Sequence, residues 1–406
     1  MATLEFHINI KSIDKSDWKI YKFSEIAKSI SERVEPTETE LETYVGLEHL
    51  DSDSIHIKRF GKREDVSGTK LRCYPGDVIF GRRRAYQRKA AIVDFDGFCS
   101  AHALVLRANP SVIDPKLFPF FLHSNTFMHR AVDISVGSLS PTINWGTLKN
   151  EEFLLPPKDQ QARLAELLWA ADNFLEKQIS LLLNLETAFQ VEIEHQIHGV
   201  SFSNLTIDKF LEALSKKFAI EPLENQGEFL KGKGISKSQV QEKGVPCVRY
   251  GELYTRHNRV IRKFYSFISG DVAASSTRLK QHDVLFAGSG ETIEEIGKSA
   301  AFVDTVEAYA GSDTLIFRPN DQNGIYLGYL LNSWLVRQQL NKLGTGATIV
   351  HIYPTDLKGV LVPKRSRNDQ DKIAEKLEEF ESTKKAIDKH ISNSKQLQKS
   401  LINQIF

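Results

Sequence analysis

Two stretches of the chain, each about 40 residues long, place apolar side chains three or four positions apart. The first runs from Asp159 to about His198, the second from Asp369 to about Phe406, and neither interior contains Gly or Pro. This spacing predicts continuous helices with one apolar stripe, close to a coiled-coil heptad seam. The seam residues are Leu164, Leu168, Leu175, Leu182, Phe189 and Ile193 in the first stretch and Ile373, Leu377, Phe380, Ile387, Ile391 and Leu401 in the second.

The segments before these stretches alternate short apolar runs with turn residues. Runs such as DVIF from Asp77 and ALVLR from Ala103 contain β-branched or aromatic residues bounded by Gly, Pro and Asp, which predicts strands. Residues 116–132 have the apolar spacing of a helix. A last apolar run, residues 153–155, is predicted to be a strand that Pro156 ends. Each segment is therefore expected to be a strand-rich α+β domain.

The same order of motifs occurs twice, which predicts a duplicated domain. DVIF, AAIVD and ALVLR in the first half match DVLF, AAFVD and TLIFR in the second. The joint between each domain and the long helix that follows it is also repeated, as LKNEEFLLPPKDQQARLAELL from Leu148 and LKGVLVPKRSRNDQDKIAEKL from Leu357. A period near 200 residues is too long for a solenoid. We expect two globular domains, 1–157 and 200–364, which are followed by helices at 158–199 and 365–406.

The connectivity predicts how the two helices pack. A helix of about 40 residues is roughly 60 Å long, which exceeds the width of a compact domain of this size. Only HGVSFSN separates the end of the first helix from the second domain. The helices are therefore expected to form an antiparallel coiled coil with pseudo-two-fold symmetry. The alternative is that each helix packs only on its own domain.

Bulk composition narrows the choice of function. The net charge of +1 means that any nucleic-acid-binding surface must be local. Three scattered cysteines fit neither a disulfide framework nor a zinc cluster. The first residues, MATLEFHINIKSIDKSD, lack the apolar core of a signal peptide, and no run of 18 apolar residues suggests a membrane span. A cytoplasmic protein without membrane contact is expected.

Motifs that would indicate an active site are incomplete. FAGSG at Phe286 matches a glycine turn that cradles S-adenosylmethionine, but the [N/D]-P-P-[Y/F] motif that accompanies it is lacking. GKS at Gly297 resembles the end of a P-loop, yet Thr292 stands where that motif requires glycine. The histidines have no convincing metal-ligand spacing. We therefore predict no catalytic residues, no metal site and no cofactor bound by this chain.

Polar and basic loops lie at matched places in the two copies. Arginine reads guanine, glutamine reads adenine, and lysine or arginine neutralises phosphates. The candidate DNA-binding residues of the first domain are Arg82, Arg83, Arg84, Tyr86, Gln87, Arg88, Lys89, Ser138, Ser140, Thr142 and Asn144. Those of the second domain are Lys231, Lys233, Lys237, Arg256, Asn258, Arg259, Thr277, Arg278, Lys280, Ser289, Thr345, Thr348 and His351. Different loops on one duplicated frame suit two modules that read different sequences.

Together these motifs resemble the specificity subunit of type I restriction-modification systems. The shared pattern is a recognition domain that ends in a proline, a polar bridge, Q-x-x-[IL]-A-x-x-L and a long helix. Here it falls at residues 157–168 and 363–377, with a longer bridge in the second copy. The DV[IL]F strand and the G-[ST] loop before the last strand also match, and the resemblance covers nearly the whole chain.

The resemblance implies a non-catalytic DNA-specificity subunit in a prokaryotic cell. Each recognition domain would read one half of a bipartite site in double-stranded DNA, and the coiled coil would set the unread spacer. The coiled coil would also dock two methyltransferase subunits that modify adenine N6 with S-adenosylmethionine. Motor and restriction subunits would supply ATP- and Mg-dependent translocation and cleavage. The alternative is a coiled-coil scaffold that presents two protein- or RNA-binding domains.

Overall fold

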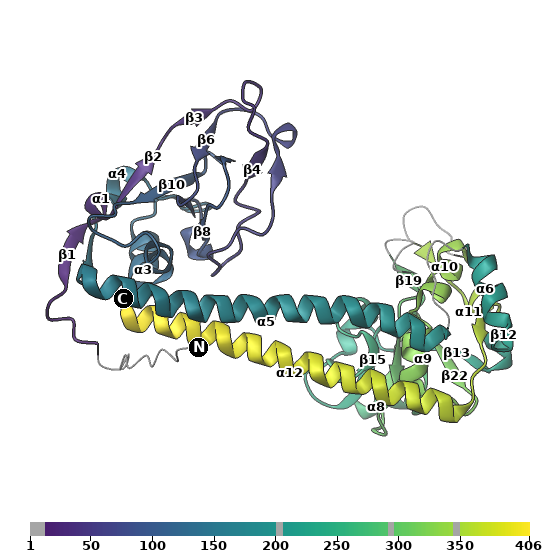
Figure 1. Cartoon of the computed structure of the whole chain (residues 1–406). Coiled ribbons are helices and arrows are strands. Elements are labelled where there is room, and N and C mark those ends of the chain that lie inside the picture. The colour runs from purple at the N-terminus through teal and green to yellow at the C-terminus, as the bar shows by residue number, and fades with distance from the viewer. Residues whose placement is uncertain (1–12, 200–205, 291–295, 344–349) are drawn as a thin grey trace, which may run out of the picture. The chain divides into compact units, whose positions relative to one another are not determined.

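The computed structural model of the chain describes residues 13–199, 206–290, 296–343 and 350–406 (Figure 1). Its internal contacts define two units. The first combines Met1–Leu181 with Ile387–Phe406, and the second is Leu182–Ala386. Each unit therefore contains one globular part and a segment of both long helices, whereas the sequence placed the boundaries between globular parts and whole helices.

Strands of the first globular part form three sheets. β7 (Val78–Gly81) is buried along its whole length, as expected for an inner strand with a continuous apolar run. One sheet has the order β2 (Ala27–Ile30), β10 (Ala103–Ala108), β7 (Val78–Gly81), β8 (Ala90–Ile92). Another has the order β3 (Arg33–Val34), β6 (Lys70–Cys73), β9 (Gly97–Cys99), β4 (Thr43–Val45), β5 (Gly61–Lys62). The third pairs β1 (Lys19–Lys22) with β11 (Glu152–Leu155).

Four short helices accompany these strands, namely α1 (Phe23–Ile26), α2 (Phe118–His123), α3 (Asn125–Asp133) and α4 (Trp145–Leu148). The prediction of one helix over residues 116–132 was wrong. Ser124 adopts an extended conformation between α2 and α3, and its hydroxyl accepts a hydrogen bond from the N–H of Phe127. Serine is a preferred N-cap because its oxygen satisfies a free N–H of the first turn, so it begins a new helix here.

The second globular part repeats this plan with four sheets. The largest has the order β13 (Gly227–Lys231), β22 (Thr314–Pro319), β18 (Val284–Ala287), β20 (Ser299–Phe302), β15 (Arg259–Ile261). The next has the order β16 (Ser266–Ile268), β14 (Val245–Val248), β21 (Tyr309–Ala310), β17 (Thr277–Arg278). Two-stranded pairs join β12 (Ile220–Pro222) to β24 (Leu361–Pro363) and β19 (Ser289–Gly290) to β23 (Val350–His351). Its helices are α6 (Ile207–Ser215), α7 (Tyr250–Thr255), α8 (Gly270–Ser275), α9 (Gly324–Leu330), α10 (Trp334–Leu343) and α11 (Pro354–Lys358).

A buried ion pair shows the duplication at atomic detail. In the first unit, the guanidinium of Arg107 donates to both oxygens of Asp77 at 2.7 and 3.0 Å. In the second, Arg318 donates to both oxygens of Asp283 at 2.9 and 2.8 Å. Each aspartate opens the DV[IL]F strand and each arginine lies near the end of its neighbour strand. Because a carboxylate this deeply buried needs a partner, the pair fixes the register of the two central strands.

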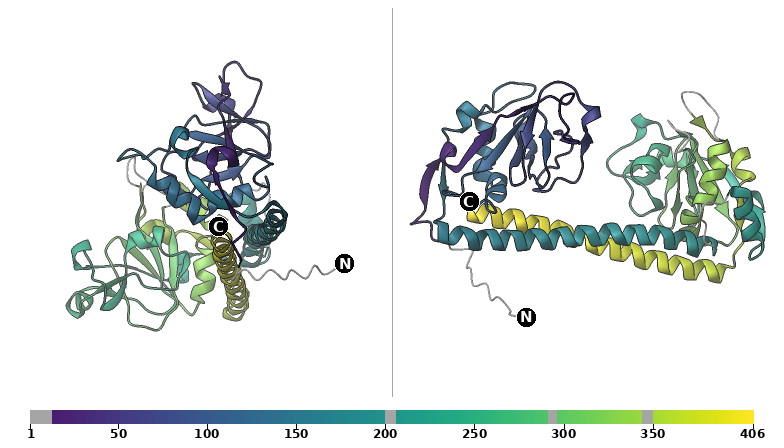
Figure 2. Two further views of the ribbon diagram at one scale, coloured as in Figure 1. Left: turned by 90° about the vertical axis from the view of Figure 1, so that its left-hand side faces the viewer. Right: turned by 45° about the horizontal axis from the view of Figure 1, so that its top comes forward.

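The long helices are α5 (Lys158–His198) and α12 (Arg367–Ile405), which run side by side (Figure 2). In the first unit, Gln398 donates to Asp172 at 2.8 Å. In the second, Lys376 donates to Gln196 at 3.4 Å. Residue numbers along α12 therefore fall as those along α5 rise, so the pairing is antiparallel. The α+β class and the antiparallel helix pair are both confirmed.

Helix packing on the globular part also contributes to each unit's core. In the first unit, α5 and α12 bring apolar side chains onto α2; in the second, they bring them onto the central strands. Burying one such side chain contributes about 1.5–3 kcal/mol. The buried seam residues are Leu164, Leu168, Leu175, Ile193, Ile373, Leu377 and Ile391. The partly buried ones are Leu182, Phe189, Phe380, Ile387 and Leu401.

A glutamine fixes the start of each long helix to its globular part. The N–H of Asp114 donates to Gln161 Oε1 at 2.6 Å, and Gln161 Nε2 donates to the carbonyls of Val112 and Pro156, both at 2.9 Å. At the second joint, the N–H of Asn323 donates to Gln370 at 2.9 Å. These are the glutamines of the repeated Q-x-x-[IL]-A motif.

Gln161→Ala is expected to destabilise the first unit by roughly 1–3 kcal/mol, because it leaves three backbone groups without partners. Hydrogen exchange at the Asp114 amide and thermal unfolding measure the effect. The matched control is Gln160→Ala, which removes the neighbouring, half-exposed glutamine. Equal effects of the two substitutions would contradict the role of the buried amide.

Candidate nucleic-acid interface

The arginines that follow β7 lie beside a second polar segment of the first unit. Arg83 and Thr142 face each other in an antiparallel bridge. Next to it, the N–H of Ile143 donates to the carbonyl of Arg82 at 2.9 Å. The two loops that the sequence identified separately therefore form one surface.

The segment that ends at Thr142 is a short hairpin. Val136 and Thr142 exchange backbone hydrogen bonds of 3.0 and 2.9 Å. The N–H of Arg84 donates to the carbonyl of Pro141 at 2.7 Å, which ties the hairpin to the arginines. The predicted contacts on this hairpin and just after it are at least partly exposed: Ser138, Ser140, Thr142 and Asn144.

Basic side chains from other elements gather at the same place. Burial, followed by the positive charges of Arg83 and Arg82, lowers the pKa of His102. Lys70 of β6 adds to the same shift. Neither His102 nor Lys70 was predicted from the sequence, because each lies on a separate element and has no motif around it. The cluster concentrates positive charge that bulk composition does not reveal.

Tyr86 and Gln87 lie on a single 3₁₀ turn, Ala85–Gln87. The residues on either side, Arg84 and Arg88, have φ angles of 54° and 53°. Such left-handed conformations are uncommon for residues with a Cβ, so this turn is sharply defined. The ring of Tyr86 is 55% exposed and available to a partner.

Three predicted DNA contacts already have partners inside their own unit. Arg88 donates to Asp53 at 2.6 Å, and the ammonium of Lys89 donates to a backbone carbonyl at 2.6 Å. Arg259 donates to Gln190 of α5 at 3.2 Å. These bonds tie loops together, so these side chains are less available to DNA than Arg83 or Arg84; their role in DNA binding stays a prediction.

The second unit repeats the bridge with different side chains. Here Ser289 faces His351. Beside this bridge, the N–H of Ile352 donates to the carbonyl of Gly288 at 3.0 Å, the counterpart of the bond beside the first bridge. The two units therefore present unlike side-chain pairs from the same backbone frame.

The glycines of FAGSG allow close packing around this second bridge. A Cβ on Gly290 would lie 2.7 Å from the hydroxyl oxygen of Tyr254, and that hydroxyl donates to the carbonyl of Ser289 at 2.8 Å. A Cβ on Gly288 would lie 3.0 Å from the carbonyl oxygen of Asp313. Glycine is needed at both positions because a Cβ would crowd these neighbouring atoms, which explains the motif structurally.

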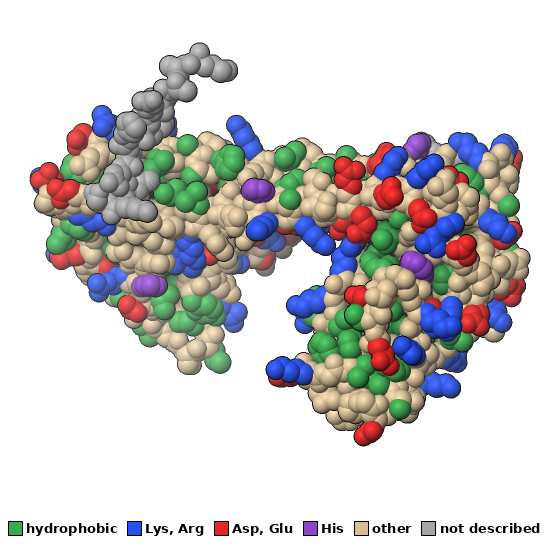
Figure 3. All heavy atoms as spheres, turned by 90° about the horizontal axis from the view of Figure 1, so that it is seen from below, with side chains coloured by type: hydrophobic (Ala, Val, Ile, Leu, Met, Phe, Trp, Pro, Cys, Tyr) green, Lys and Arg blue, Asp and Glu red, His purple; other side chains and the backbone are tan. Residues whose placement is uncertain are grey.

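The remaining candidates of the second unit lie around its smaller sheet and α7. The Thr277 hydroxyl donates to the carbonyl of Lys231 at 2.8 Å, and the guanidinium of Arg256 lies over the ring of Tyr265 at 5.3 Å. Several others are exposed: Lys233, Lys237, Asn258, Arg278 and Lys280. Thr345 and Thr348 lie outside the described residues. Elsewhere, on the face drawn in Figure 3, acidic and basic side chains are interspersed.

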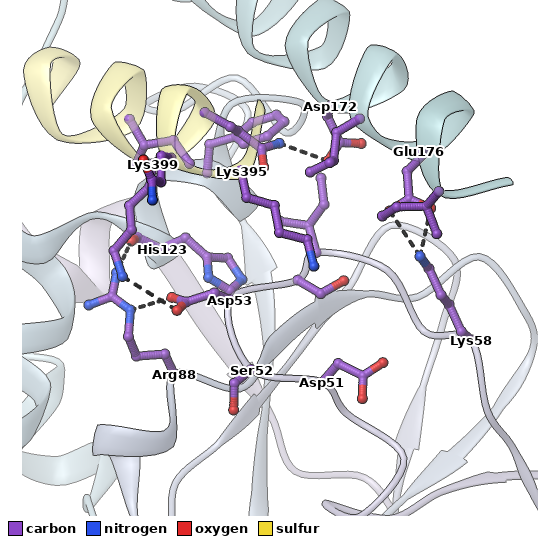
Figure 4. A pocket seen from close by; sticks show the side chains of 18 residues that line it. Asp51, Ser52, Asp53, Lys58, Arg88, His123, Asp172, Glu176, Lys395 and Lys399 are labelled. Atoms are coloured by element: carbon purple, nitrogen blue, oxygen red, sulfur yellow. Dashed lines mark hydrogen bonds and ion pairs between the residues drawn. The ribbon is translucent and has the colours of Figure 1, made fainter. Parts of the chain in front are cut away.

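A cavity of about 470 Å³ lies in the first unit, between residues 51–58, α2 and both long helices (Figure 4). Its charged walls are paired: Lys58 with Glu176 at 2.7 Å, and Arg88 and Lys399 with Asp53 at 2.6 and 3.4 Å. The cavity therefore has no strong excess of charge to select an ion. Its contacts instead connect residues 51–58 to the two helices.

Next to this cavity, His56 Nε2 lies 2.6 Å from Asp172 Oδ2. The hydrogen bond to Asp172 is the main cause that raises the pKa of His56, and burial opposes it. The charges of Glu176 and Lys58 make smaller, opposite contributions. Protonation of His56 therefore strengthens its contact with Asp172 of α5.

Comparison with known proteins defines the class. Residues 15–185 match the family model described as the type I restriction modification DNA specificity domain. The EcoDI type I restriction enzyme specificity subunit of Escherichia coli is 25% identical over 170 residues, which are 41% of this chain and 38% of that protein. The putative MjaX type I specificity subunit of Methanocaldococcus jannaschii is 22% identical over 398 residues, covering 89% of this chain and 86% of that protein.

Two solved structures share the fold. A chain from a study of complex assembly and conformational transition of the type I restriction-modification system has a TM-score of 0.59 at 18% identity, covering 95% of this chain and 96% of that one. The type I S subunit from M. genitalium has a TM-score of 0.55 at 15% identity, covering 97% and 98%. The fold and the motifs are those of type I specificity subunits. Residues 15–185 of this chain thus share the DNA specificity domain of that family.

In the part of the chain that the structure describes, none of the helices combines the length and the apolar character that a membrane span requires. The same residues contain no group of three or more His, Cys, Asp or Glu side chains placed to hold a metal ion.

The contact between His56 and Asp172 predicts a pH-dependent stability of the first unit. Because folding raises the pKa of His56, its stabilising effect is complete below the unfolded value of about 6.5 and is lost as pH rises through the folded value. The difference in melting temperature between the wild type and His56→Gln should therefore shrink as pH rises. Thermal unfolding over this range measures it, with the exposed His129→Gln as control; a pH-independent difference would contradict the prediction.

Proposed function

We propose that this protein is the DNA-specificity subunit of a type I restriction-modification complex, in which each unit reads one half of a bipartite site. The observation that carries the proposal is the repeated bridge with unlike side chains, Arg83 with Thr142 and Ser289 with His351. Arginine donates two hydrogen bonds to guanine, and serine or threonine bonds to several bases. One frame with two different pairs suits recognition of two different half-sites.

On this proposal, the chain performs no reaction and binds no cofactor itself. Two methyltransferase subunits would dock on the helix pair and modify adenine N6 with S-adenosylmethionine, and restriction subunits would use ATP and Mg. Exposed apolar side chains on α5 support a protein partner there; they are Phe174, Leu181, Leu183 and Val191. The complex would act in the cytoplasm of a prokaryote.

A groove of about 280 Å³ between the helices of the second unit gives further support. Leu185, Phe189, Ile193, Leu377 and Phe380 line it. Its rim carries charged and amide side chains from both helices, which suits a polar edge around an apolar contact. The alternative scaffold that binds protein or RNA through its globular parts is not favoured, because residues 15–185 match a DNA specificity domain.

Methylome sequencing tests the proposal directly. Cells that express the chain with a co-purifying methyltransferase subunit should methylate adenine within one asymmetric bipartite motif. The same cells without this chain are the control. Adenine methylation with no bipartite motif would contradict the function.

Arg83→Ala is expected to relax specificity only in the half-site read by the first unit, at a cost of roughly 1–3 kcal/mol for cognate DNA. Ser289→Ala is the reciprocal control, because it alters the matched position of the second unit. Competition binding with duplexes scrambled in one half at a time separates the two effects. An equal loss for every duplex would mean that Arg83 contacts phosphate rather than a base.

Lengthening both long helices by one turn, about 5.4 Å, should lengthen the unread spacer by roughly one to two base pairs. The reason is that the proposed spacer depends on the length of the helix pair. The spacer of the methylated motif, compared with that of the wild type in the same host, is the measurement. A methylated motif with an unchanged spacer would show that the helix pair does not set the spacer length.

A further inference from the structure

Leu139 lies in the hairpin that ends at Thr142, and its side chain is 90% exposed. Val136 of the same hairpin is 71% exposed. Single exposed apolar residues are common on protein surfaces, so exposure alone indicates nothing. What distinguishes Leu139 is its setting, a constrained hairpin next to a basic cluster.

The backbone around Leu139 is held from both sides. Val136 and Thr142 exchange two hydrogen bonds, and the Thr142 hydroxyl donates to the carbonyl of Ser140 at 3.0 Å. Arg84 then binds the hairpin to the arginine segment through the carbonyl of Pro141. Because the backbone of this hairpin is already ordered, inserting the Leu139 side chain into a partner costs little backbone entropy.

The charge next to the hairpin selects the kind of partner. Arg82 and Arg83 lie at its base, and with Lys70 they lower the pKa of His102. Ser138 and Ser140 flank the apolar tip, and the contacts of the described residues show no acidic side chain bonded to this hairpin. An apolar tip next to a cluster of basic side chains complements nucleic acid, in which phosphates lie on the outside and stacked apolar bases on the inside.

We propose that Leu139 is a wedge that enters a base step of the half-site read by the first unit and partly unstacks it. The idea rests on the proposed function, because it assumes that this unit binds DNA. The cost of unstacking a step is offset by burial of the leucine and by phosphate contacts of the basic side chains around the hairpin other than Arg83. Half-site selection then depends partly on how easily each step deforms.

The test uses the full chain in complex with its methyltransferase subunit and a duplex of the methylated motif, with 2-aminopurine at successive positions of the first half-site. One step should become fluorescent on binding, and Leu139→Ala should abolish that signal and weaken binding roughly tenfold. An abasic site opposite the wedged step should restore the affinity of Leu139→Ala, because the DNA is already unstacked there. Fluorescence at the methylated adenine, which a methyltransferase flips out, should persist in the variant.

Two controls separate the wedge from other roles. Leu139→Met keeps a long apolar side chain and should retain the signal, while Ile20→Ala, at an exposed apolar residue of β1 in the same unit, should change nothing. Unchanged fluorescence and affinity for Leu139→Ala would overturn the wedge and leave the proposed function intact. Loss of the methyltransferase subunit from the variant would also overturn it, by showing a protein contact. Failure of the wild-type complex to prefer its motif over scrambled DNA would instead overturn the proposed function.

Discussion

A buried glutamine amide at the start of each long helix satisfies backbone groups that neither the helix nor the sheet can reach. Gln161 bonds to Asp114, Val112 and Pro156, and Gln370 bonds to Asn323 and to the carbonyl of Arg365. An unsatisfied buried amide or carbonyl costs about 1–3 kcal/mol, so the helix can leave the globular part in few directions. The packing of α5 against α12 depends on that direction.

Within each sheet, buried contacts fix the backbone in the same way in both units, while the exposed side chains differ. Asp77 with Arg107 and Asp283 with Arg318 hold matching strands in matching register. The loops that follow β7 and β18 then pair with their partner segments through equivalent backbone bonds. Because the backbone is constrained in the same way twice, a difference between Arg83 and Ser289 is a difference in side-chain chemistry at one defined place. Such an arrangement allows recognition to change without a change of fold.

Sequence reasoning succeeded where a signal was long or repeated. The apolar stripes of α5 and α12 extend over many turns, and the motifs around Asp77 and Gln161 occur twice, so helices, duplication and joints were all predictable. It failed where one residue decides a local conformation, as Ser124 does between α2 and α3. It also missed features that depend on distant segments meeting, such as the approach of Lys70 and His102 to the arginines or the ion pair that occupies Arg88.

On the proposed function, the net charge of +1 constrains how this protein would discriminate among DNA sequences. Non-specific binding grows with the number of phosphates that cations neutralise, and several basic side chains outside the candidate DNA-binding loops are paired with carboxylates, as Lys58 and Lys399 are. The chain alone therefore gains little from phosphate contacts. On the proposed function, the few basic groups around Arg83 would supply a larger share of the binding energy than they would on a basic protein. On the proposed function, partner subunits contribute general affinity, and the chain's own contacts determine which sequence is bound.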